Sequence, residues 1–176
     1  MLERLGIEFE VVVPEVAELR SGNPDVVVIE NARRKAHAGR AKAGGEGLAL
    51  GVDTDVALDG RLLGKPDDES GARERLEALS GRTHEVLSGV VVLDTAIGTE
   101  IPVERSAIAR TEVTFNDLDA ATIDLYVASG EWQGRAGAYA IQGLGSLLVA
   151  RLQGDFSNVV GLPVGLLLQL APNLID

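Results

Sequence analysis

The chain has 176 residues, of which 45% are hydrophobic and 24% charged, values typical of a globular domain with a sizeable core. We therefore expect one domain over residues 1–176. A net charge of −11 argues against nucleic acid or an anionic membrane as the main partner, so a phosphate ligand would need local cations or a divalent metal ion. We find no cysteine, no signal peptide and no apolar run of about 18 residues, which favours a cytoplasmic protein without disulfides.

The first part of the chain predicts a helix end, a strand, a helix and a hairpin. Residues 1–6 have the pattern of the last turns of a helix closed by a glycine, and residues 7–13, IEFEVVV, predict a strand. An Asn-Pro pair begins a helix predicted over residues 23–43, with small and apolar residues one turn apart on one face. Residues 47–65 predict an apolar strand that turns at an Asp-Gly pair and returns as a hairpin.

In the rest of the chain, aspartates before apolar residues one turn apart predict helices, and β-branched runs predict strands. The predicted helices cover residues 67–81, 117–130 and 162–170, and the predicted strands cover residues 85–93, 103–115 and 146–152. The third helix is expected to be capped by Asp117 or Asp119. Because strands and helices alternate without a regular βαβ rhythm, we expect an α/β fold in which helices flank a mixed sheet.

The stretch 51–66, GVDTDVALDGRLLGKP, is the first candidate site. An apolar run ends in Asp53, and the return of the hairpin brings back Lys65 between a glycine and a proline. An aspartate in this place can hold a metal ion or activate a water as general base, and a lysine can bind phosphate or stabilise negative charge. The pair therefore indicates an anion-plus-metal site, whereas Asp55 is expected to be an exposed turn residue.

Several other charged residues have structural explanations. Lys35 lies in a basic helix whose arginines are expected to face solvent, and Glu18 lies in a loop where a surface acid is ordinary. Arg82 and His84 follow a helix end, where cations complement the helix dipole. Neither His84 nor His37 has a metal-binding spacing and no serine lies in a nucleophile elbow, which excludes zinc and a Ser-His-Asp triad.

The glycine-rich stretch 131–145 contains no Walker A pattern but carries Gln142. The amide of Gln142 can pair with the edge of a base, or it can serve the backbone of the stretch, and both alternatives remain open at this point.

Taken together, the motifs resemble the Maf family of nucleoside triphosphate pyrophosphatases. The matching stretches, in the order of the family, are FEVVVPEVAE, ENARRKA, GVDTDV, LGKP, LSGRTHEV, GEWQGRAGAYAIQG and GDFSNVVGLP. The resemblance implies a twisted α/β fold with a central cleft, similar in outline to inosine-triphosphate pyrophosphatases. It also implies hydrolysis of a nucleoside triphosphate to the monophosphate and pyrophosphate, a divalent metal ion (Mg²⁺ or Mn²⁺) and a homodimer.

The resemblance implies the catalytic residues as well. Asp53 matches the proposed proton acceptor of the family. Glu18, Lys35 and Lys65 match the acidic and basic residues around the phosphates and the metal ion, which makes Asp53 and Glu18 the expected metal ligands.

Substrate choice is implied by Asp53-Thr54 and Gln142, which resemble the branch that acts on dTTP and UTP. The other branch carries Ser-Asp-Gln and a glutamate, and prefers 7-methyl-GTP. An amide side chain can accept from the imide N–H of thymine or uracil and donate to its carbonyl groups, whereas a carboxylate can only accept. Arg82, in the LSGRTHEV stretch, is expected to bind substrate too.

The sequence departs from the family pattern before residues 1–6, where members carry a strand and a Ser-x-Ser-Pro-Arg-Arg loop. We expect a misassigned start or a truncation, because these residues look cut from a helix; the alternative is a short protein that is an impaired enzyme or a nucleotide-binding protein. Ala17 and Asp55 also replace a common acid and a common apolar residue. Two further functions stay open, a non-catalytic regulator linked to septum formation and an inosine-triphosphate pyrophosphatase.

Overall fold

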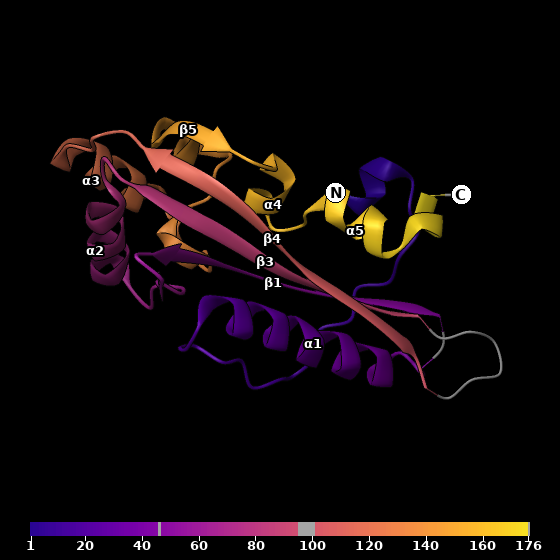
Figure 1. The fold of residues 1–176 in the computed structure, drawn as a ribbon. Helices are drawn as coiled ribbons and strands as arrows, with labels where there is room; N and C mark the ends of the chain where they lie inside the picture. The colour runs from indigo at the N-terminus through magenta and orange to yellow at the C-terminus, as the bar shows by residue number, and fades with distance from the viewer. Residues whose placement is uncertain (46, 95–100, 176) are drawn as a thin grey trace.

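A five-stranded sheet with strand order β2-β1-β3-β4-β5 organises the chain (Figure 1). The computed structural model describes residues 1–45, 47–94 and 101–175. Its helices and strands are η1 (Leu2–Leu5), α1 (Pro24–Lys42), β1 (Leu48–Leu58), β2 (Arg61–Leu62), α2 (Glu69–Leu79), β3 (Thr83–Asp94), β4 (Val103–Phe115), α3 (Ala120–Ser129), η2 (Ala136–Ala138), η3 (Gly143–Leu147), β5 (Val149–Gln153), α4 (Phe156–Val160), α5 (Val164–Leu170) and η4 (Pro172–Ile175), where η marks a 3₁₀ helix. None of the described helices is long and apolar enough to cross a membrane.

The α/β class is confirmed, but the strand pairing differs from the expected mixed sheet. Every pairing within the described residues is antiparallel. After β1 and the short β2, helix α2 stays at the same end of the sheet, so β3 begins beside the end of β1 and runs back along it. Ala57 therefore pairs with Glu85, and Leu48 with Asp94. A parallel neighbour would require the chain to cross to the opposite end first.

Side-chain caps begin the helices where the sequence predicts them. Asn23 accepts hydrogen bonds from two backbone N–H groups at the start of α1, and Asp68 accepts one at the start of α2. Of the two alternatives for α3, Asp119 is the cap, because its carboxylate accepts from the Thr122 backbone. The short helix α4 was not predicted, although Asp155 caps it in the same manner.

The strand predicted over residues 7–13 is wrong. The described residues offer this segment no neighbouring strand, and β-branched residues form a strand only where a partner accepts them. The side chains of Phe9, Val11 and Val13 are exposed. The segment is held instead by α1, since Lys42 Nζ donates to the Val13 carbonyl oxygen at 3.1 Å.

The predictions at the carboxyl-terminal end are shifted by a few residues. Strand β5 begins at Val149 rather than at Ser146, because the preceding residues form η3. Helix α5 begins at Val164, directly after Pro163, which fits the absence of a backbone N–H on proline.

The largest core cluster lies on the face of the sheet opposite α1, where α2, α3 and the glycine-rich stretch pack against it. The side chains predicted to face inward from α2 and α3 are buried, as are the aromatic residues of this part of the chain. The cluster includes Val56, Ala72, Leu76, Leu79, Val86, Phe115, Ile123, Tyr126, Val127, Trp132, Tyr139 and Leu148. Helix α5 covers the other end of the same sheet through Leu167, next to Val92.

Helix α1 covers the opposite face of the sheet and approaches it closely at Gly51 and Gly89. A Cβ atom on Gly51 would lie 2.2 Å from the Ala32 carbonyl oxygen, and one on Gly89 would lie 2.3 Å from the Val28 carbonyl oxygen. Real Cβ atoms do not approach backbone oxygens so closely. The position of α1 therefore depends on these two residues having no side chain.

We predict that Gly51→Ala and Gly89→Ala each destabilise the fold by about 1–3 kcal/mol or more, because the added methyl group meets the helix backbone. The measurement is the urea midpoint of unfolding. Gly39→Ala is the matched control, since a Cβ on Gly39 meets nothing within 4 Å. It should be neutral or stabilise α1 by about 0.5–1 kcal/mol. Equal midpoints for Gly51→Ala and wild type would contradict the role of close approach.

Candidate active site

Asp53, Lys35 and Glu18 meet in one polar cluster between β1 and α1. Lys35 Nζ lies 2.5 Å from Asp53 Oδ1 and 2.7 Å from Glu18 Oε1. The Asp53 side chain is 12% exposed, whereas that of Glu18 is 37% exposed. The structure thus brings together three residues that are far apart in the sequence and that the sequence predicted to act together.

Asn31 holds this cluster in place, and the sequence reasoning missed it. Its side chain is buried, and Nδ2 donates to Asp53 Oδ2 and to the Leu19 carbonyl oxygen, both at 3.0 Å. Oδ1 of the same amide accepts from the Leu19 backbone N–H at 2.8 Å. The available signal was an amide one turn before Lys35, on the face of α1 that also carries Val28.

The charges of the cluster reinforce one another. The hydrogen bond from Lys35 lowers the pKa of Glu18, although burial opposes this. Burial alone would lower the pKa of Lys35, but its hydrogen bonds to Asp53 and Glu18 outweigh burial and raise that pKa. Lys35 therefore stays protonated, with its ammonium group between two carboxylates.

Asp55 is not the exposed turn residue that the sequence predicted. It lies within β1, and its Oδ1 accepts from the backbone N–H groups of Val56 (2.7 Å) and Gly64 (3.1 Å). Burial raises the pKa of Asp55, and the two backbone hydrogen bonds oppose that change. The carboxylate ties the returning hairpin to β1 and so fixes the corner that carries Lys65.

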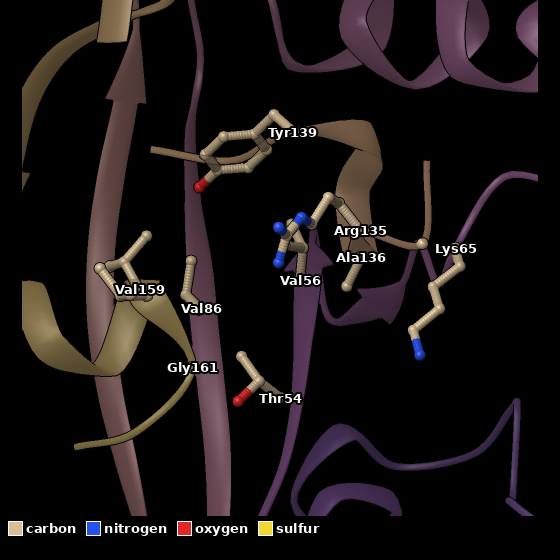
Figure 2. Close-up of a pocket in the computed structure, with 11 residues that line it drawn as sticks. Thr54, Val56, Lys65, Val86, Arg135, Ala136, Tyr139, Val159 and Gly161 are labelled. Carbon is tan, nitrogen blue, oxygen red and sulfur yellow. The ribbon is translucent and has the colours of Figure 1, made fainter. Parts of the chain in front are cut away.

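Lys65 is exposed and forms no ion pair within the described ranges. Its charge lowers the pKa of Glu18, which places it near the polar cluster. It also lines a pocket of about 130 Å³ (Figure 2). Lys65 therefore stands between the cluster and the pocket.

The pocket lies on the other side of β1 from the polar cluster. Successive side chains of a strand alternate between its faces, so Asp53 contacts α1 while Thr54 enters the pocket. Thr54 Oγ1 lies 2.7 Å from Ser88 Oγ on β3. The remaining wall is apolar except for two cations and one tyrosine. The lining residues are Thr54, Val56, Lys65, Val86, Gly134, Arg135, Ala136, Tyr139, Val159, Val160 and Gly161.

The far wall of the pocket is formed by the glycine-rich stretch, which is attached to the hairpin. The Gly137 backbone N–H donates to the Gly64 carbonyl oxygen at 2.8 Å. This contact brings Arg135 into the pocket lining together with Lys65. Among the described residues, Arg135 forms no ion pair with a carboxylate. The sequence analysis assigned Arg135 no role.

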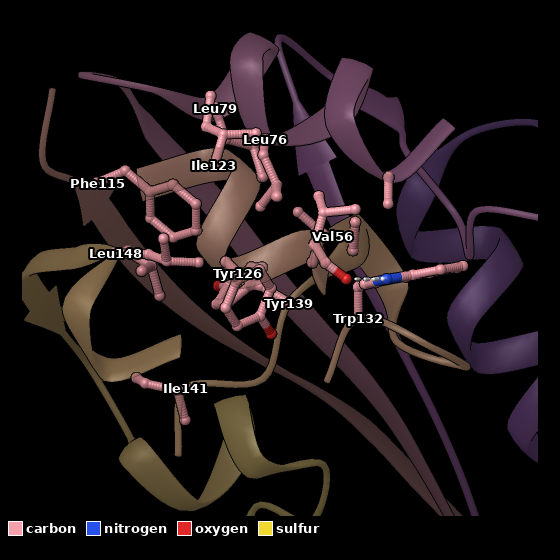
Figure 3. Close-up of a cluster of buried hydrophobic side chains, with 14 of the residues drawn as sticks. Val56, Leu76, Leu79, Phe115, Ile123, Tyr126, Trp132, Tyr139, Ile141 and Leu148 are labelled. Carbon is pink, nitrogen blue, oxygen red and sulfur yellow. Dashed lines mark hydrogen bonds between the residues drawn. The ribbon is translucent and has the colours of Figure 1, made fainter. Parts of the chain in front are cut away.

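A buried pair, His84 and Tyr139, supports this wall from the core. Figure 3 shows Tyr139 among the buried hydrophobic side chains, near Tyr126. His84 Nε2 lies 2.8 Å from the Tyr139 hydroxyl oxygen, and both rings pack edge-on against Phe115. Burial lowers the pKa of His84 to about 4 and raises the pKa of Tyr139. Both side chains are therefore neutral at neutral pH, which makes His84 a core residue and not the helix-end cation that the sequence allowed.

Arg82 and Gln142 lie outside the cluster and the pocket lining. Both oxygens of Asp59 accept from Arg82 Nη2 at 2.8 Å, so Arg82 braces the turn between β1 and β2. Gln142 is exposed and precedes η3, and it is not among the residues that line the pocket. Their roles in binding substrate stay predictions.

The donor set of the cluster suits a divalent cation only in part. Within the part of the chain that the structure describes, no three Asp, Glu, His or Cys side chains come together as a metal site. Glu18 and Asp53 nevertheless converge on the Lys35 ammonium group. Mg²⁺ is commonly held by one or two carboxylates and completed by substrate phosphates and water. The two carboxylates therefore fit such a partial site.

Comparison with known proteins decides the family. The profile of the Maf-like protein family matches residues 1–174. The chain belongs to the Maf family. A dTTP/UTP pyrophosphatase of Bacillus cereus (strain AH820) is 42% identical over 173 residues, covering 96% of this chain and 86% of that protein. Proteins of the same description from Bacillus thuringiensis subsp. konkukian (strain 97-27) and Bacillus anthracis are 42% and 41% identical with the same coverage. The Maf resemblance read from the motifs is thus confirmed.

We predict that Asn31→Leu destabilises the protein by about 1–3 kcal/mol, because the Leu19 backbone groups and Asp53 lose their partner. Freed from α1, the segment before the helix should be cut faster by trypsin after Arg20, which is exposed. Native-state proteolysis followed by mass spectrometry measures this. His37→Gln, an exposed change on the same helix, is the control. Equal cleavage rates for Asn31→Leu and wild type would count against the tether.

The buried His84 predicts a pH dependence of stability. Its pKa is about 4 in the folded chain against 6.5 as the ordinary value, so the unfolded chain binds more protons between these limits. The stabilisation is complete above pH 6.5 and is lost as pH falls toward 4, in total about 3 kcal/mol. The free energy of unfolding is measured with urea at several pH values between 5 and 7. His84→Gln should make this free energy depend less steeply on pH than it does in wild type. An unchanged slope would contradict a buried neutral imidazole.

Proposed function

We propose that the chain hydrolyses dTTP and UTP to the monophosphate and pyrophosphate. The observation that carries the proposal is the acid–lysine cluster on one side of β1 and, on the other, a pocket whose two cations have no carboxylate partner among the described residues. Lys65 joins the two. The description of its relatives as dTTP/UTP pyrophosphatases supports this choice of substrate.

In this proposal Asp53 acts on the attacking water. Lys35 and Asn31 each donate to one of its oxygens, which fixes the orientation of the carboxylate. Asp53 orients the water and takes its proton, and the new bond forms between the water oxygen and the α phosphorus. The bond between the α phosphorus and the oxygen that bridges it to the β phosphate breaks, and pyrophosphate leaves with the electron pair of that bond.

The lysines offset the negative charge that accumulates on the phosphates. Lys65 is the better placed for direct contact, because it is exposed and has no carboxylate partner in the described ranges. Lys35 acts from within the cluster. In a chain with net charge −11, these local cations and Arg135 are what a triphosphate would meet.

We further propose that Glu18 and Asp53 hold a divalent cation, Mg²⁺ or Mn²⁺. When bound, the cation supplies charge neutralisation at the phosphate oxygens. Thr54 is proposed to contact the nucleoside, since it lines the pocket. Gln142 and Arg82 are proposed as outer substrate contacts, and a cytoplasmic homodimer is proposed as the working form.

The test is pyrophosphate release from dTTP, UTP, 7-methyl-GTP and ITP with Mg²⁺ or Mn²⁺, alongside the Bacillus cereus relative. We predict release from dTTP and UTP, and none after chelation of the metal. Asp53→Asn should lose about 10²-fold or more in kcat, the usual contribution of a general base. Asp67→Asn, a change at an exposed aspartate near the hairpin, is the matched control.

Three outcomes would overturn parts of the proposal. No release from any nucleotide, with the relative active, would exclude hydrolysis by this chain. A preference for ITP would replace the pyrimidine substrates. Full activity of Asp53→Asn would remove the general-base role.

A further inference from the structure

Tyr139 and Thr54 are the described residues with uncharged polar side chains that line the pocket. Figure 2 shows the hydroxyl end of Tyr139 directed toward Val86 and Val159, two other lining residues. Within the described residues the hydroxyl has a single partner, His84 Nε2 at 2.8 Å. The hydroxyl can therefore make one more hydrogen bond than it makes in this structure.

The surroundings of His84 decide in which direction the hydrogen bond to Tyr139 runs. His84 is 2% exposed, and its Nδ1 atom has no hydrogen-bond partner. If Nδ1 carried the proton, a buried N–H donor would have no acceptor, an arrangement that folded proteins rarely contain. If Nε2 carries the proton, His84 donates to the Tyr139 oxygen and Nδ1 is left as a bare lone pair.

The second tautomer leaves the Tyr139 proton free. Burial keeps the imidazole from taking a second proton at neutral pH, and it keeps the phenol protonated. The oxygen of the Tyr139 hydroxyl then accepts from His84, and the hydroxyl can donate its own hydrogen into the pocket. Among the other described residues of the lining, Lys65 and Arg135 are donors, the Thr54 hydroxyl can donate or accept, and none carries a carboxylate.

We infer that Tyr139, positioned by His84, donates a hydrogen bond to a carbonyl oxygen of the pyrimidine base. The inference rests on the proposed function for the identity of the ligand. A wall that presents several hydrogen-bond donors and apolar side chains, and no carboxylate among its described residues, suits a base that carries carbonyl acceptors at its edge. His84 is a positioning residue in this arrangement, because its hydrogen bond goes to Tyr139 and it does not line the pocket.

The experiment measures binding in the absence of turnover. UTP, 2-thio-UTP and 4-thio-UTP are titrated by calorimetry in a chelating buffer into wild type and Tyr139→Phe. Because sulfur is a poorer acceptor than oxygen, wild type should bind one of the two thio compounds more weakly than UTP. Tyr139→Phe should bind UTP about three- to tenfold more weakly, the worth of one neutral hydrogen bond, and should no longer distinguish that thio compound from UTP.

Tyr126→Phe is the matched control. Tyr126 is a buried tyrosine of the same cluster, but its hydroxyl accepts from the Ala140 backbone N–H and does not line this pocket. Its substitution should leave the discrimination between UTP and the thio compounds unchanged. His84→Phe should weaken UTP binding as Tyr139→Phe does, and His84→Gln, which restores an N–H donor, should recover part of it.

The outcomes separate this inference from the proposed function. Tyr139→Phe that binds all three nucleotides as wild type does, or no binding of UTP to wild type, overturns the inference. UTP that binds through Tyr139 but is not hydrolysed when metal is added supports the inference and overturns the proposed activity. Equal effects of Tyr126→Phe and Tyr139→Phe would show a general consequence of losing a buried hydroxyl and not a contact with the base, and would overturn the inference as well.

Discussion

The contact of α1 with the backbone of two sheet positions is the constraint on which the rest of the site depends. Because Gly51 and Gly89 present no side chain, the helix backbone lies directly on β1 and β3. At that depth Asn31 and Lys35 reach Asp53, which pairs with Gly89 across the two strands. The same amide of Asn31 anchors the segment that carries Glu18. A helix seated a side-chain layer higher would leave the acid, the lysine and the loop unconnected.

The polar network that results is short and almost saturated, and this explains how it survives half-buried. Each oxygen of Asp53 receives a hydrogen bond, and Lys35 offsets two carboxylates. Removing Lys35 or Asn31 leaves a mostly buried oxygen of Asp53 without its partner, and this costs more than the net worth of the lost bond. Asp55 extends the same principle to the hairpin, where backbone N–H groups satisfy it.

The sequence predicted what depends on neighbours along the chain. Caps such as Asn23 and Asp119, and the inward faces of α2 and α3, follow from local patterns, and the motifs indicated the family and the partners of Asp53. What failed depended on contacts remote in sequence. Residues 7–13 have strand propensity but no strand beside them, and the His84–Tyr139 pair joins positions 55 residues apart. The role of Asn31 was not predicted, because no local sequence pattern distinguishes a buried amide from an exposed one.

The alternation of side chains along β1 has a consequence for how such a protein changes over time. Position 53 belongs to the cluster under α1, and position 54 belongs to the pocket on the opposite face. A replacement at 54 or 56 alters the shape and polarity that a ligand meets without touching the groups that hold Asp53. With the proposed roles, recognition and chemistry are therefore separable within the four consecutive residues 53–56. New ligand preferences can arise on this frame, or be designed into it, while the polar cluster is inherited unchanged.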